Sequence, residues 1–145
     1  MSSDMSIDNE SSGKFILKPI GYVRSDLKRI EDCPLQGNEN APEAWLEIEP
    51  GFTDGIDDIG VGSEVVLLTW FHKANREVIK CYRRNEIESP PVGVFNTRSP
   101  DRPNPIGLHI VKVLEIIKGK IRVFPLEALD GTPLIDIKPV LKNEL

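Results

Sequence analysis

The stretch of this 145-residue chain best suited to chemistry is GVFNTRSPDRPNPIG, from Gly93 to Gly107. Its three prolines fix their own φ and push each preceding residue towards an extended conformation. The loop would therefore present Arg98, Arg102 and Asn104 with little conformational freedom, which lowers the entropy lost on binding. Arginine binds carboxylates and phosphates in bidentate geometry. A rigid surface turn with solvated arginines is the alternative, and the spacing leaves both interpretations open.

Two carboxylates near the end of the chain, Asp130 and Asp136, are candidate catalytic residues. A carboxylate with an ordinary pKa of about 3.9 is a poor base, so either would need burial to take a proton. Asp130 begins an Asp-Gly-Thr-Pro turn, and its side chain could simply cap that turn. Asp136 alternates with Ile135 and Ile137, so its alternative is a solvated strand face, paired with Lys138.

Charge is distributed unevenly along the chain. The net charge is −5 and the pI is about 5.1, which argues against a nonspecific nucleic-acid binder. However, residues 43–64 contain seven acids and no basic residue, whereas residues 65–122 contain eleven basic residues against five acids. Two solvated faces or a basic patch for phosphates would both explain this pattern. The candidate RNA contacts of such a patch are Arg76, Lys80, Arg83, Arg84 and Arg102.

The cysteines and the N-terminus bear on metal binding and location. Cys33 and Cys81 form no CxxC pair and show no zinc-ligand spacing with His72 or His109, so no metal is predicted. Two unpaired cysteines fit a reducing cytoplasm. The polar N-terminus lacks the basic start and apolar core of a signal peptide. No apolar run approaches the roughly 18 residues of a membrane span. We therefore expect a cytoplasmic protein without a membrane partner.

The elements that must position these residues are short strands. Glycine and proline punctuate the sequence, and no long amphipathic helix is available for parallel crossovers, so we expect an all-β sandwich or barrel. Residues 1–14 are predicted to form a disordered tail and residues 15–145 a single domain. Residues 25–43 are predicted to be a long loop, 51–62 a helical turn, and Lys118-Gly119 a hairpin turn. The predicted strands are 15–24, 44–49, 63–71, 78–84, 92–97, 108–117, 120–126 and 134–140.

Four segments of the chain carry a family resemblance. They are IGYVRS at 20–25, WFHKANRE at 70–77, TRSPDRPNPIGLHIVKV at 97–113 and LDGTPLIDIKP at 129–139. Together they resemble the TsaA-like family over roughly residues 19–141. That family contains the TrmO-type methyltransferase, which uses S-adenosyl-L-methionine (AdoMet) to methylate threonylcarbamoyladenosine beside the tRNA anticodon.

The resemblance implies a mainly β, small barrel-like domain with a mixed or antiparallel sheet and short helical turns. It would form a homodimer and bind AdoMet near the dimer interface. It would not be a Rossmann domain, in agreement with the lack of GxGxxG after a strand. The expected catalytic residues are Asp130, Asp136, Arg98 and Asn104. By position, the expected cofactor contacts are Pro34, Leu35, Gln36, His72, Lys73, Arg98, Leu108, Leu126 and Glu127.

Two departures from the family keep other functions open. Leu35 stands where the family has an arginine, and the bacterial tRNA enzymes carry an additional C-terminal domain whereas this sequence ends at Leu145. The expected partner is threonylcarbamoylated tRNA. The alternatives are an AdoMet-binding regulatory module, or a methyltransferase for another RNA or a small molecule.

Overall fold

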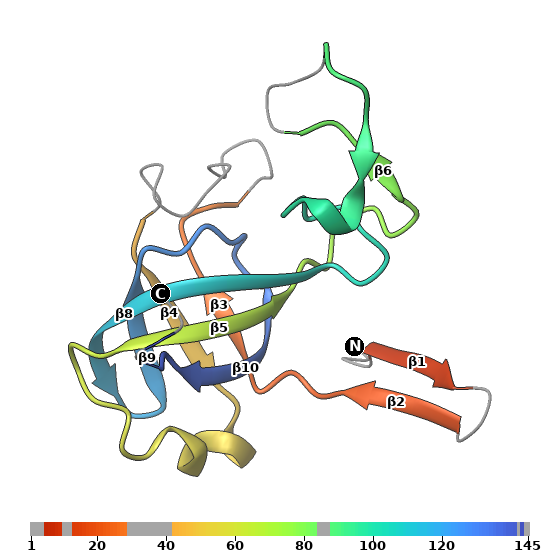
Figure 1. Ribbon diagram of the computed structural model, residues 1–145. Coiled ribbons are helices and arrows are strands. Elements are labelled where there is room, and N and C mark those ends of the chain that lie inside the picture. The colour runs from red at the N-terminus through yellow and green to blue at the C-terminus, as the bar shows by residue number, and fades with distance from the viewer. Residues whose placement is uncertain (1–4, 10–12, 29–41, 84–87, 142, 144–145) are drawn as a thin grey trace.

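A closed barrel of six antiparallel strands forms the centre of the computed structural model, which describes residues 5–9, 13–28, 42–83, 88–141 and 143 (Figure 1). Its neighbouring strands follow the order β10-β3-β4-β9-β8-β5 and back to β10. The predicted β class is confirmed as a barrel rather than a sandwich, with antiparallel pairing throughout. The strands are β3 (Gly21–Arg24), β4 (Ala44–Ile48), β5 (Glu64–Trp70), β8 (Ile106–Ile117), β9 (Lys120–Phe124) and β10 (Pro133–Pro139).

Alternation of inward- and outward-facing residues along most of the strands builds the core. Successive side chains of a strand point to opposite faces, so every second residue faces the interior. In β8, His109 and Val111 are buried, whereas their neighbours Leu108 and Ile110 are exposed on the outer face. Gly107 has no room for a side chain, because a Cβ there would collide with the ring of Phe71 and the hydroxyl of Thr69. The fully buried residues of the core include Val23, Leu46, Leu67, Val111, Ile121, Val123, Leu126 and Leu134.

The turn between β8 and β9 forms as its sequence predicts. Lys118 and Gly119 have φ values of 48° and 79°, and a two-residue hairpin turn with positive φ at both positions matches the twist of its strands. The predicted helical turn within 51–62 is the 3-10 helix η2 (Pro50–Ile56). Among the described residues, no helix is both long and apolar enough to span a membrane.

Three predicted strands differ from the structure. The strand expected over 15–24 is interrupted around Pro19, where Ile20 N instead donates to Leu134 O. Its first half belongs to β2 (Gly13–Leu17), which pairs with β1 (Met5–Asn9) in a separate hairpin that includes part of the expected tail 1–14. Of the predicted strand 78–84, the structure describes residues 78–83, and among these only β6 (Lys80–Cys81) is a strand. Residues 92–97 divide into β7 (Val92–Gly93) and the 3-10 helix η3 (Val94–Asn96), because Thr97 N bonds back to Val94 O.

Antiparallel pairing places three of the connections between barrel strands at the same end of the barrel. Connections 25–43, 71–105 and 125–132 join strands at what we call the loop end. Residues 49–63 and the turn at 118–119 lie at the opposite, or turn, end. The fold therefore brings the predicted site segments, which are far apart in sequence, to one end of the molecule.

Candidate functional site

A lobe formed by residues 72–104 leaves the barrel between β5 and β8 and projects beyond it (Figure 1). Its base is closed by a hydrogen bond of 2.8 Å from Phe71 N to Pro105 O. Within the lobe β6 pairs with β7, and Val94 N donates to Ile79 O. Val94 is completely buried, so the lobe has a small interior of its own.

Arg102, predicted to contact RNA, points into the lobe. Its Nε donates to Ser99 O at 2.7 Å, and its Nη2 donates to Val94 O at 3.1 Å and to Thr97 O. The prolines remove amide donors from this segment, so its carbonyls need partners outside a regular ladder. The guanidinium supplies those donors and holds the loop around itself.

Arg76 connects the first turn of the lobe to its last. Its guanidinium lies over the Trp70 ring, 5.0 Å from the centroid, and its Nε donates to Pro103 O at 2.7 Å. Its Nη2 donates to Asn104 Oδ1 at 3.1 Å. The amide NH2 of the exposed Asn104 is therefore directed away from Arg76 and remains available as a donor. Asp101 strengthens the connection by accepting from Asn75 N at 2.8 Å.

Several exposed cations of the lobe have no acidic partner. Among the described residues, Lys73, Lys80, Arg83 and Arg98 form no ion pair. An unpaired arginine such as Arg98 suits a carboxylate or a phosphate. His72 lies at the base of the lobe, where partial burial, and then the charge of Lys73, hold its pKa below the ordinary value. Its imidazole is therefore neutral at pH 7 and has a lone pair to accept a proton.

A chain of buried polar side chains crosses the loop end of the barrel. Thr69 Oγ1 lies 2.8 Å from His109 Nε2, and His109 Nδ1 lies 3.0 Å from Glu127 Oε1. Thr69 and His109 are buried, whereas the Glu127 side chain is 20% exposed. The second carboxylate oxygen of Glu127 is therefore left for another partner. Thr69 and His109 were not among the predicted site residues, although a histidine at an inward position of an apolar strand is a usable signal.

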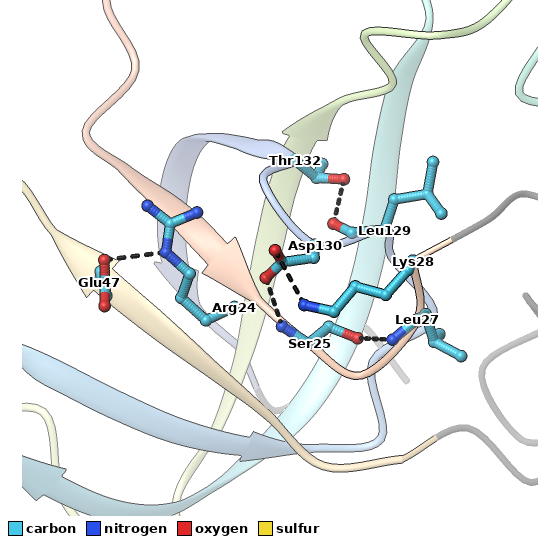
Figure 2. Close-up of polar contacts among 8 residues, drawn as sticks. All are labelled: Arg24, Ser25, Leu27, Lys28, Glu47, Leu129, Asp130 and Thr132. Carbon is cyan, nitrogen blue, oxygen red and sulfur yellow. Dashed lines mark hydrogen bonds and ion pairs between the residues drawn. The ribbon is translucent and has the colours of Figure 1, made fainter.

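Asp130 joins the end of β3 to the 125–132 connection (Figure 2). Its Oδ1 accepts from Ser25 N at 3.0 Å, and its Oδ2 lies 3.1 Å from Lys28 Nζ. The amide of Ser25, and then the ammonium of Lys28, hold the pKa of Asp130 below its ordinary value. A carboxylate stabilised in its ionised form is a poor proton acceptor. Asp130 forms part of a cleft of about 750 Å³, also lined by Arg24, Asp26, Pro42, Glu43, Ala44 and Trp45.

Three other predicted residues lie apart from the polar side chains of Thr69, His109 and Glu127. Asp136 is on the outer face of β10, with Oδ2 3.2 Å from Lys138 Nζ, as its alternative interpretation expected. Leu108 also points outwards and is 47% exposed. Leu126 is fully buried in the core, and its N donates to Pro42 O. The predicted residues Pro34, Leu35, Gln36 and Arg84 lie outside the described residues.

Comparison with known proteins identifies the family of this chain. Residues 22–144 match the family model described as "tRNA-methyltransferase O N-terminal domain". A relative from Methanothermobacter thermautotrophicus, named "Probable S-adenosyl-L-methionine-binding protein", is 43% identical over 88% of this chain and 90% of its own length. A relative from Archaeoglobus fulgidus, named "S-adenosyl-L-methionine-binding protein", is 42% identical over 85% of this chain and 87% of its own.

Solved structures give the same result at the level of the fold. A structure titled "Crystal structure of TrmO from Pseudomonas aeruginosa" is 30% identical, with a TM-score of 0.69 over 89% of this chain and 58% of that one. A second TrmO structure from that organism is 32% identical, with a TM-score of 0.70 over 88% of this chain and 55% of that one. The present chain thus spans a little more than half the length of these TrmO structures.

Proposed function

The chain belongs to the tRNA-methyltransferase O N-terminal domain family, and on that premise we propose that it is an AdoMet-dependent tRNA methyltransferase. Its substrate would be threonylcarbamoyladenosine beside the anticodon, methylated at N6. The family match carries the proposal, because it extends over the barrel and the lobe together. The domain would be the single unit predicted over 15–145. The predicted residues that gather at the loop end are His72, Lys73, Arg98, Asn104, Glu127 and Asp130.

The donors and acceptors at the loop end fit AdoMet, which when bound supplies an activated methyl group. Its amino-acid end carries a carboxylate and an ammonium, and its ribose carries two hydroxyls. Arg98 is an exposed cation with no ion pair to any described residue, and it suits the carboxylate. Glu127, with one oxygen held by His109, keeps the other for a hydroxyl or ammonium. We assign AdoMet contacts to these two residues and to His72 and Lys73, with Pro34, Leu35 and Gln36 from the 25–43 connection.

Among the predicted residues, His72 is best suited to take the proton of the acceptor nitrogen. In the proposed reaction the lone pair of the acceptor nitrogen would form the new N–C bond, while the methyl–sulfur bond would break with its electron pair leaving on sulfur. The N–H proton would pass to a base, and its electron pair would stay on the nitrogen. The neutral imidazole of His72 can take that proton, whereas Asp130 is held as an anion by Ser25 and Lys28. Asn104, directed by Arg76, is placed to orient the base through its NH2 group. We therefore give Asp130 a positioning role and His72 and Asn104 the contacts with the substrate.

The outer face of β5 and β8 supports the proposed homodimer. Ile106, Leu108 and Ile110 are exposed there, next to Val66 and Leu68 in register. A contiguous apolar face of this kind is typical of a protein interface. Asp136 pairs with Leu68 on the other side of β5, so a second copy seated on this face would cover the predicted residues Leu108 and Asp136 together. We place the dimer in the cytoplasm, with its tRNA substrate.

A methyl-transfer assay tests the proposed function. The full chain would be incubated with AdoMet and tRNA containing threonylcarbamoyladenosine, and the nucleosides would be analysed by mass spectrometry after digestion. We expect a nucleoside heavier by one methyl group, lost in Arg98→Ala because the cofactor carboxylate loses its cation. Lys120→Ala, which removes an exposed cation at the turn end, is the matched control and should retain activity.

A regulatory AdoMet-binding module is the second candidate. It is favoured by the names of the relatives from Methanothermobacter thermautotrophicus and Archaeoglobus fulgidus, which state AdoMet binding and no reaction. The same experiment separates the two, when combined with calorimetric titration of AdoMet. Binding of AdoMet without any new nucleoside would contradict methylation of this tRNA and support the module or another substrate. Absence of AdoMet binding would contradict both candidates.

A further inference from the structure

The lobe exposes large apolar side chains that it could have buried. Phe95 is 78% exposed, Ile79 59% and Tyr82 51%, although the adjacent Val94 is completely buried. Aromatic side chains usually contribute their large area to a core or an interface. The lobe therefore has an interior, and these aromatic rings lie outside it, on a surface available to a partner.

The pairing of β6 with β7 shows that one side of this ribbon is open. On the inner side, Cys81 faces Val92, and its Sγ lies 3.7 Å from Thr97 Oγ1. On the outer side, Lys80 faces Gly93, where an added Cβ would meet nothing within 4 Å. Phe95 follows Gly93 by two residues in η3. A partner can thus approach the ribbon closely at Gly93, opposite Lys80.

The charge of the lobe is opposite to that of the whole chain. The lobe contains seven basic and four acidic residues, in a protein with a net charge of −5. Arg76 and Arg102 are used within the lobe, as is Asp101. The described cations left without an ion pair are Lys73, Lys80, Arg83 and Arg98. A surface that combines exposed aromatic rings with unpaired cations matches an anionic partner that also has flat apolar faces.

We propose that this outer side of the lobe binds the unpaired loop of an RNA, with Phe95 stacking on a splayed base. Tyr82 offers a second ring, and Lys80 and Arg83 contact the adjacent phosphates. Proteins that bind single-stranded RNA combine aromatic stacking with a basic track in this way. The inference rests on the proposed tRNA substrate, and it adds where the RNA loop lies and which side chain holds a base.

Binding of two RNAs to the full chain tests the stacking step. The probes are a labelled anticodon stem–loop and a blunt duplex of equal length. Alanine substitution of a stacking ring weakens binding by about 1–3 kcal/mol per base, so Phe95→Ala should bind the stem–loop about 5- to 150-fold more weakly. Binding of the duplex, which offers no unpaired base, should hardly change. Phe95→Trp should restore stem–loop binding, and Phe95→Leu should not.

Matched variants separate stacking from charge. Phe52→Ala removes a phenylalanine that is 38% exposed in the acidic region of the turn end, and it should bind both RNAs as the wild type does. The double variant Lys80→Ala/Arg83→Ala should lower the log–log salt slope of stem–loop binding by about 1.4, since each single-strand phosphate contact contributes about 0.7. Stem–loop binding unchanged in Phe95→Ala would overturn the proposal.

Two further results would also overturn it. If Phe95→Ala weakens AdoMet binding in calorimetry to the same extent, the ring belongs to the cofactor pocket. If it converts a dimer to a monomer in sedimentation, the ring belongs to an interface between copies. Failure of the proposed function is distinguishable: Phe95-dependent stem–loop binding without methyl transfer would contradict the reaction alone. Methyl transfer with Phe95-independent binding would contradict the stacking surface alone.

Discussion

The two ends of the barrel terminate the same six strands but are built differently. At the turn end, β8 and β9 are joined by two residues, and the 49–63 connection is acidic and short of cations. At the loop end, the other three connections leave the barrel, and one of them is a basic lobe with an interior of its own. The strands give both ends the same support. The two ends therefore differ first in the connections that leave them.

Polar groups inside the barrel follow the same division. At the turn end, Ile56 and Ile59 pack against the core, and Ile48 N donates to Gly119 O at 3.0 Å, so apolar side chains and backbone bonds close the barrel. At the loop end, Thr69, His109 and Glu127 form a polar chain that leads from the interior to a partly exposed carboxylate. A buried polar side chain is tolerated where it has hydrogen-bond partners, and the buried Thr69 and His109 both have them.

The largest expected effect is a loss of stability when the barrel core, which supports both ends, is truncated. Leu67 faces the barrel interior and is completely buried. Leu67→Ala should lower the free energy of unfolding by about 2–5 kcal/mol, because it removes apolar contacts and leaves a cavity. Denaturant unfolding followed by probes at each end should give coincident transitions. Leu68→Ala, on the half-buried outer side of the same strand, is the control and should cost less. Separate transitions in Leu67→Ala would show that the ends do not share one cooperative unit.

Arg102→Ala should affect the loop end alone. The variant takes a charged donor from the carbonyls of Val94, Thr97 and Ser99, and hydrogen bonds to charged groups are worth about 1.5–3 kcal/mol each. Hydrogen exchange of the lobe amides should accelerate by at least about tenfold, while protection of the barrel strands is retained. Arg102→Lys should not rescue it, because one ammonium cannot reproduce the planar fork. Arg98→Ala serves as the folding control, and a uniform loss of protection across the chain would contradict a local role.

The difference between the ends also explains what the sequence could predict. Strands 44–49, 63–71 and 108–117 were predictable because a two-residue period is a local property, and Lys118-Gly119 is a local turn. The split around Pro19 and the short pairing of β6 with β7 depend on partners elsewhere in the chain. The family resemblance supplied the segments of the site. Their common position at the loop end follows from strand order, which no single segment contains.

Side-chain partners within the site were beyond sequence reasoning for the same reason. The contact between His109 and Glu127 joins residues 18 apart, and that between Thr69 and His109 joins residues 40 apart. Arg102 was predicted as an outward-facing cation, and its inward direction follows from carbonyls that the prolines leave without donors. Charge counts identify the lobe as basic, but only the structure distinguishes the cations used internally from those that remain for a ligand.

The smallest expected effect concerns how the 125–132 connection is held at the loop end. The pKa of Asp130 is lowered by Ser25 N and Lys28, so its contribution to stability is present above the unfolded-state pKa and is lost as the pH falls through the folded-state pKa. Asp130→Asn keeps an acceptor for Ser25 N but loses the charge opposite Lys28, a partly exposed pair worth under about 1 kcal/mol. Denaturant unfolding at low ionic strength should show this deficit at pH 7.

The deficit of Asp130→Asn should shrink below about pH 4, where the unfolded wild-type carboxylate becomes protonated. Asp136→Asn is the control. It removes the ion pair with Lys138, whose Nζ lies 3.2 Å from Asp136 Oδ2 on the outer face of β10, and it measures how much stability such a pair contributes away from the loop end. A deficit for Asp130→Asn that stays constant across this range would show that the charge does not hold the connection. The backbone bonds from Asp130 N to Leu27 O and from Gly131 N to Val23 O, both 2.7 Å, would then hold the connection, as backbone bonds do at the turn end.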